Sequence, residues 1–206
     1  MREGEDVYLL AGSLFTGLSM WVKNEGLSFW AALFLASIVI CFFKGVKIDR
    51  KKFLPAIFFI PLVIYLPWVI FKHRLGIEIG CLDNSLGNFA PSIAQRLVIM
   101  FHAYRASYFN VGQWNIFWFV FVVYLAWFLI SPKDKRLFFF VFIIFFQLIF
   151  YAIVFIVWPV SNQTIELYIF SAMERLPLHM LPLALFFVCQ QAGRSFLLER
   201  PNNVYE

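Results

Sequence analysis

Six long apolar runs constrain the fold of this chain more than any other feature of its sequence. Each run is 16 to 22 residues long and contains no Asp, Glu, Lys or Arg. A helix of about 20 residues, rising 1.5 Å per residue, crosses a hydrocarbon core of about 30 Å. The runs occupy residues 7–22, 27–43, 53–71, 114–130, 137–158 and 176–193. They predict an all-α, polytopic transmembrane helix bundle of six spans, forming one transmembrane domain over residues 1–206.

The composition excludes a soluble globular domain and a nucleic-acid-binding protein. Hydrophobic residues make up 62% of the chain and charged residues 14%, whereas ordinary domains are about half apolar and a quarter charged. The net charge is +5. The Lys and Arg residues that produce it lie in short connectors between the apolar runs, which is typical of membrane topology and not of a surface that binds nucleic acid.

The sequence predicts neither a metal nor a cofactor. Cys41, Cys81 and Cys189 are too scattered for a disulfide framework or a thiolate site, and His73, His102 and His179 lie far apart. Phosphate-binding Gly-rich loops, a dinucleotide fingerprint and the zinc-protease motif are absent from the sequence.

The distribution of positive charge predicts the orientation of the chain. Eleven of the 17 Lys and Arg residues lie in the amino terminus, the connectors 44–52 and 131–136, and the carboxyl tail. Because cytoplasmic loops are enriched in Lys and Arg, these segments and both termini are expected in the cytoplasm. The predicted location is the plasma membrane, in a multi-pass arrangement.

Pro55, Pro61 and Pro67 interrupt the third run at a spacing of six residues, which places them on different faces of a helix. In a membrane, neighbouring helices can satisfy the carbonyl groups that a proline leaves without a donor. A bent helix is therefore expected here.

The outer connector 72–113 is the longest polar segment, and its second half predicts a short amphipathic helix. Gln95, His102 and Arg105 fall on one side of this helix. The apolar residues that recur at helical spacing are Ile93, Leu97, Met100, Phe101, Tyr104 and Tyr108. Beside a membrane such a helix lies in the interface. It is expected either to cap the bundle or to contact a substrate, and the sequence favours neither.

Two polar segments on the predicted outer side carry candidate chemistry. Residues 23–26 form a tight turn with Lys23 and Glu25, which either only reverses the chain or meets a charged lipid head group. In the second segment, Arg175 and His179 are four residues apart and share a helical face. This pair suits a phosphate because guanidinium is a bidentate donor. It is equally compatible with an interfacial arginine and a histidine buried against a carbonyl.

The two segments together resemble the bacterial relatives of protein O-mannosyltransferases, which are membrane glycosyltransferases of the C-type fold with polyprenyl-phosphate sugar donors. Residues 23–26 resemble a Lys-x-Glu-Gly turn of that family, and residues 175–182 resemble its Arg-Leu-x-x-His-x-x-Pro helix start. The resemblance extends over residues 7 to 190.

The resemblance implies that Lys23, Arg175 and His179 bind the donor phosphate. Arg96, His102 and Arg105 of the outer helix are additional candidates, and Glu25 and Glu174 are supporting polar contacts. It also implies membrane lipid and a polyprenyl-phosphate-linked sugar as partners, with no cofactor beyond that substrate.

The family's acidic catalytic loop has no counterpart in this sequence. The chain therefore resembles the carboxyl-terminal half of such an enzyme. The resemblance is compatible with a truncated reading frame, with a degenerate remnant, and with one piece of a split gene whose other chain supplies the amino-terminal half and the catalytic base. The alternatives are a non-catalytic membrane subunit or scaffold and, less favoured because no span holds a buried acid, a small transporter.

Overall fold

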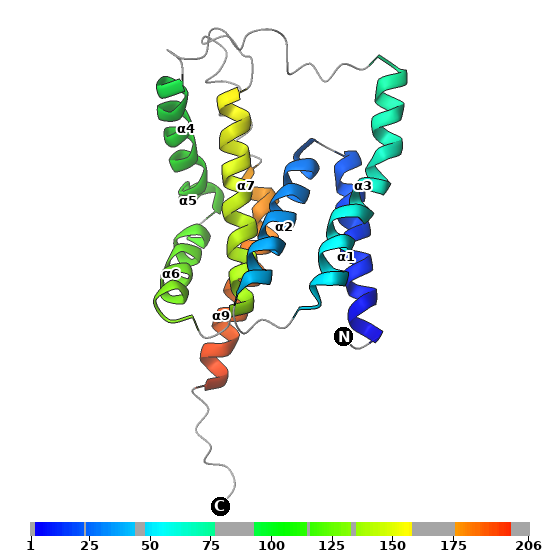
Figure 1. Ribbon diagram of the computed structural model, residues 1–206. Helices are drawn as coiled ribbons and strands as arrows, with labels where there is room; N and C mark the ends of the chain where they lie inside the picture. Colours follow the sequence, from blue (N-terminus) through cyan, green and yellow to red (C-terminus); the bar gives the residue numbers. More distant parts are fainter. Residues whose placement is uncertain are drawn as a thin grey trace, which may run out of the picture. The chain divides into compact units, whose positions relative to one another are not determined.

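A computed structural model describes residues 3–22, 24–43, 48–76, 93–114, 116–132, 135–157 and 176–198. These residues form helices and no strand, so the all-α prediction is confirmed for them (Figure 1). The elements are α1 (Glu3–Val22), α2 (Asn24–Phe42), α3 (Arg50–Arg74), α4 (Ile93–Tyr108), α5 (Val111–Trp114), α6 (Phe117–Ile130), the 3₁₀ turn η2 (Lys135–Leu137), α7 (Phe138–Val157) and α9 (Leu176–Leu198).

Three helical segments are long and apolar enough to cross a membrane, namely Glu25–Phe42, Arg50–Arg74 and Lys135–Ile156. Two shorter apolar helices, Asp6–Val22 and Phe117–Ile130, accompany them. Many large apolar side chains of these helices are exposed in the isolated chain, among them Phe15, Phe59 and Val123, as expected for surfaces whose natural solvent is lipid. The helices are those of an integral membrane protein.

Helix α3 extends beyond the apolar run from which it was predicted. It begins at Arg50 because the Asp49 side chain caps it, accepting a hydrogen bond from the Lys51 amide at 3.2 Å. Helix α6, by contrast, is shorter than the predicted span 114–130. It begins only at Phe117, and Trp114 belongs to the separate short helix α5. Hydropathy alone therefore does not determine these boundaries.

The chain forms two compact units. Unit 1 comprises Met1–Phe89 and Val141–Pro159, and unit 2 comprises Ala90–Phe140 and Val160–Glu206. In unit 1, α1 packs against both α2 and α3. The amino end of α1 and the start of α3 lie at the same end of this unit (Figure 1), where the Lys52 ammonium is 3.4 Å from the Asp6 carboxylate.

Glycines allow the helices of unit 1 to approach closely. A Cβ atom on Gly17 of α1 would lie 2.9 Å from Ile64 Cβ and 3.0 Å from Pro61 Cα of α3. A Cβ on Gly26 of α2 would collide with the main chain of Ser19 in α1. Small residues at helix contacts are characteristic of membrane bundles, in which van der Waals packing provides much of the association energy.

Two tryptophans supply hydrogen bonds at the proline positions of α3. Pro61 has no N–H to donate to the carbonyl of Ile57, and the Trp30 indole of α2 donates to that carbonyl at 3.0 Å. The Trp21 indole of α1 donates to the carbonyl of Ile64, three residues before Pro67, at 2.6 Å. Helix α3 changes direction along its length (Figure 1). The expectation that a neighbouring helix satisfies a carbonyl freed by a proline is confirmed at Pro61. The Ile64 carbonyl is not the one that Pro67 leaves without a donor, which is that of Val63, so the Trp21 bond only adds to the contact between α1 and α3.

In unit 2, helices α6 and α9 pack through aromatic rings. Phe187 of α9 contacts Phe121 and Phe128 of α6, with ring centroids 5.7 and 5.5 Å apart. The Tyr108 hydroxyl of α4 donates to the Met180 sulfur of α9 at 3.4 Å. These contacts connect α4 and α6 to α9 within unit 2.

Candidate functional site

Three of the predicted site residues, Lys23, Glu174 and Arg175, lie outside the described residues. The other five are described. Glu25 belongs to unit 1, and the remaining four belong to unit 2, namely Arg96, His102, Arg105 and His179.

The three cations of α4 do not share one face of the helix. Arg96 is buried, with 6% of its surface exposed, whereas His102 and Arg105 are exposed. Nine residues separate Arg96 from Arg105, which corresponds to about half a turn around the helix axis at 3.6 residues per turn. Two distinct groups result, one buried guanidinium and one exposed pair.

The buried face of α4 differs from the apolar set recognised in the sequence. It consists of Arg96, Met100, Ala103 and Ser107. Leu97 and Phe101 are exposed. Since a helix in contact with lipid can direct apolar side chains outward and polar ones inward, hydropathy alone does not identify the buried face.

His179 is exposed on α9, which contradicts the alternative of a histidine buried against a carbonyl. The buried residues of α9 are Pro177, Met180, Ala184 and Phe187. They recur at helical spacing and place His179 outside their face. Met180, the next residue along the chain, is buried and contacts Tyr108. His179 itself lies on the exposed surface of the helix.

Glu25 lies beside a buried polar cluster that the sequence interpretation missed. The Ser28 hydroxyl donates to the Glu25 carbonyl at 2.8 Å, and the Gln147 side-chain amide of α7 donates to the Ser28 oxygen at 2.8 Å. Gln147 has 3% of its surface exposed. These residues all belong to unit 1. A hydrogen-bonded chain thus connects the first turn of α2 to the middle of α7.

The hydrogen-bond order fixes the orientation of the Gln147 amide. Ser28 has one hydroxyl hydrogen and uses it on the Glu25 carbonyl, so it can only accept from Gln147, and Nε2 must face it. The opposite atom, Oε1, is buried and has no hydrogen-bond partner among the described residues. An unsatisfied buried acceptor of this kind suits a small hydrogen-bond donor.

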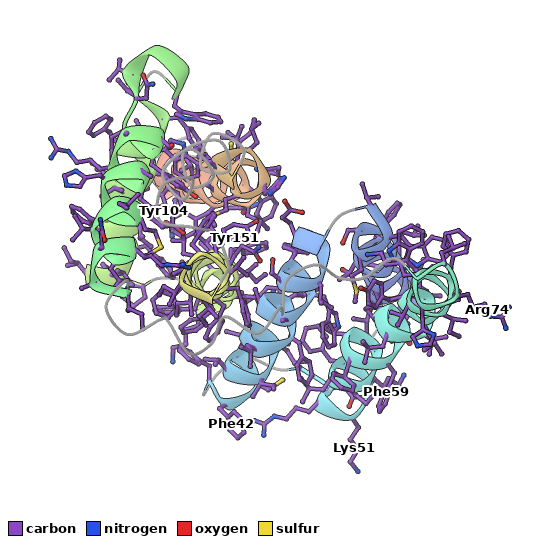
Figure 2. The ribbon with its side chains drawn as sticks, turned by 90° about the horizontal axis from the view of Figure 1, so that it is seen from above. Phe42, Lys51, Phe59, Arg74, Tyr104 and Tyr151 are labelled. Carbon is purple, nitrogen blue, oxygen red and sulfur yellow. The ribbon has the colours of Figure 1, made fainter. Side chains whose placement is uncertain are left out.

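Tyr151 completes the cluster one turn further along α7. Its side chain is buried, interacts with the Gln147 side chain and experiences the charge of the Glu25 carboxylate. Figure 2 labels Tyr151 on this helix. The cluster therefore places a carboxylate, a hydroxyl, an amide and a phenol at the end of unit 1 where α2 begins.

A sequence signal for this cluster was available. Gln147 is the one amide, acid, base or histidine in the apolar run 137–158, and polar side chains within a span usually face the protein interior. Its partner could not be read from the sequence, because Ser28 lies 119 residues away. Among the described residues, no three His, Cys, Asp or Glu side chains gather in a manner suited to a metal ion.

Comparisons with known proteins identify no relative of this chain, since no family model, no curated protein and no solved structure matches it.

Proposed function

We propose that this chain is a membrane glycosyltransferase-like protein that binds a polyprenyl-phosphate sugar donor at the outer face of the bacterial inner membrane. The observation that carries the proposal is the polar cluster of Glu25, Ser28, Gln147 and Tyr151, which adjoins the turn at residues 23–26. Gln147 and Tyr151 are buried in it, and Glu25 and Ser28 are partly buried. A turn that only reversed the chain would need no buried polar side chains beside it.

The proposed topology has six spans and cytoplasmic termini. It adds α1, α6 and α9 to the three helices long enough to cross. Helix α6 has 14 residues and a length of about 21 Å, so its span would include flanking residues or lie in a locally thinned bilayer. Helix α4 lies in the interface, with the exposed Leu97 and Phe101 toward the lipid.

The chemistry divides between phosphate binding and hydroxyl binding. Lys23, Arg175 and His179 would stabilise the negative charge that develops on the departing phosphate. From α4, either Arg96 or the pair of His102 and Arg105 would join them, because Arg96 is buried and the pair is exposed on the other side of the helix. Gln147 Oε1 would accept a hydrogen bond from the hydroxyl group of the molecule that receives the sugar. The negative charge of Glu25 would support this site. A separate chain would provide the base that deprotonates the hydroxyl.

The test is binding of polyprenyl phosphate to the full chain in nanodiscs. Arg175→Ala should abolish binding while the helical circular dichroism is retained. Lys51→Ala, which removes an exposed cation at the start of α3, is the matched control and should bind as the unmutated chain does. Unchanged binding by Arg175→Ala would remove this residue from the site, and no binding by the unmutated chain would refute the proposal.

A non-catalytic membrane subunit is the second candidate, and Gly26 favours it. The contact that excludes a Cβ at this position gives the glycine of the 23–26 turn a packing role that requires no ligand. The neighbouring DNA distinguishes the two candidates. An upstream reading frame with an acidic outer loop and further spans would favour a split enzyme, and the lack of one would favour the subunit.

A further inference from the structure

The carboxyl-terminal end of α3 presents a basic cluster that includes the cations Lys72 and Arg74. Lys72, His73 and Arg74 form the last turn of this helix. His73 and Arg74 are exposed, and Figure 2 shows the Arg74 side chain extending outward from α3, away from the other helices of unit 1. Cations at a helix carboxyl terminus interact favourably with its dipole, but that interaction does not require neighbouring aromatic rings.

An aromatic platform lies directly beneath these cations. The Lys72 ammonium is 5.1 Å from the centroid of the Trp68 ring. Trp68 stacks on Trp21 of α1, with centroids 5.9 Å apart and an interplanar angle of 20°, and on Phe71, at 5.5 Å and 18°. The Trp21 hydrogen bond to Ile64 fixes this platform to the bend of α3. The cation is therefore held in a defined position.

These cations lack a protein counter-charge in the part of the chain that the structure describes. Neither Lys72 nor Arg74 forms an ion pair there. The ion pair of unit 1 is Lys52 with Asp6, at the other end of α3. Just before the cations along α3, Val69, Ile70 and Phe71 are exposed, and α3 is one of the helices long enough to cross a membrane. Along α3, exposed apolar residues and a tryptophan are followed by cations. This matches the layers of a membrane leaflet, in which the acyl chains and the interface are followed by the lipid phosphates.

We propose that this end of α3 binds the phosphate of an anionic glycerophospholipid. Lys72 and Arg74 contact the phosphate, and Trp68 and Trp21 pack against the lipid at the interface. The proposal needs no sugar donor and no catalysis, so it stands independently of the proposed glycosyltransferase-like function.

The experiment is native mass spectrometry of the full chain with phosphatidylglycerol or phosphatidylcholine. The unmutated protein should retain phosphatidylglycerol preferentially. The double variant Lys72→Ala/Arg74→Ala should bind it about thirtyfold more weakly, since each cation near the surface contributes roughly fivefold. Lys51→Ala, at the opposite end of the same helix, should bind as the unmutated protein does.

Additional variants and a competition experiment distinguish the effect of charge from a loss of folding, and a lipid ligand from free phosphate. Lys72→Arg/Arg74→Lys keeps both charges and should restore most of the binding, with circular dichroism establishing that each variant folds. Full retention of phosphatidylglycerol by the double alanine variant, or an equal loss in Lys51→Ala, would overturn the site. Displacement of the lipid by millimolar inorganic phosphate would overturn the assignment to a lipid in favour of free phosphate.

Discussion

The hydrogen bond from Trp30 to the Ile57 carbonyl offers a direct test of how α3 tolerates its prolines. Trp30→Phe keeps an aromatic ring against Phe34 and Phe58 but removes the N–H donor. The Ile57 carbonyl then has no donor from its own helix, because residue 61 is proline. Interhelical hydrogen bonds in membranes contribute about 0.6 kcal/mol on average and about 1.7 at most. Since Ile57 is buried and lacks an alternative, we expect about 1.5 kcal/mol of destabilisation, toward the upper end of that range.

A double-mutant cycle with Pro61→Ala isolates this interaction. Alanine at position 61 provides the missing N–H, so the Ile57 carbonyl no longer depends on Trp30. In that background Trp30→Phe should cost only about 0.5 kcal/mol, from reduced packing, which gives a coupling of about 1 kcal/mol. The assay is reversible unfolding in bicelles, followed by circular dichroism. If Trp30→Phe destabilises both backgrounds equally, within about 0.3 kcal/mol, the account of the bend in α3 is refuted.

Three further predictions concern unit 1. Gly26→Ala should destabilise the protein by about 2 kcal/mol or more, because the added Cβ collides with the main chain of α1. The control Gly12→Ala, where the added Cβ meets open space, should be neutral or stabilising by about 0.5 kcal/mol. Equal changes in the free energy of unfolding in bicelles would contradict this prediction. Ser28→Ala leaves the Gln147 amide donor without its acceptor and should cost about 1 to 2 kcal/mol. Adding Gln147→Leu should recover most of that loss, and a double variant less stable than Ser28→Ala would argue against the polar chain. Asp6→Asn removes an exposed ion pair and should lower stability by no more than about 0.5 kcal/mol; a larger loss would show that the contact is structurally important.

The helices themselves were largely predictable from the sequence because lipid requires long uncharged runs. The run 53–71 predicted α3, and the proline spacing predicted that Pro61 would face differently from Pro55 and Pro67, as the burial of Pro61 alone among the three confirms. The donor that replaces the proline N–H was not predictable. It depends on the register between α2 and α3, which brings Trp30 to a carbonyl 27 residues away.

The candidate site was predictable only in part, for a related physical reason. Helical periodicity correctly separates Arg96 from Arg105 by angle, but it does not determine which of them faces inward when the surrounding solvent is apolar. Gln147 was visible as a polar residue within an apolar run, while its bond to Ser28 arises from packing between distant helices. The apolar pattern thus determines which segments are helical, and specific polar contacts determine how those segments pair.

We propose above all that this membrane protein recognises the phosphate of a polyprenyl carrier lipid. The most direct measurement is competition between polyprenyl phosphate and the phosphate-free polyprenol of the same chain length for the unmutated protein in nanodiscs, followed by native mass spectrometry. We predict that the phosphorylated lipid is retained and the alcohol is displaced, because the proposed contacts at Lys23, Arg175 and His179 are all to phosphate. Equal retention of the two lipids would contradict the claim.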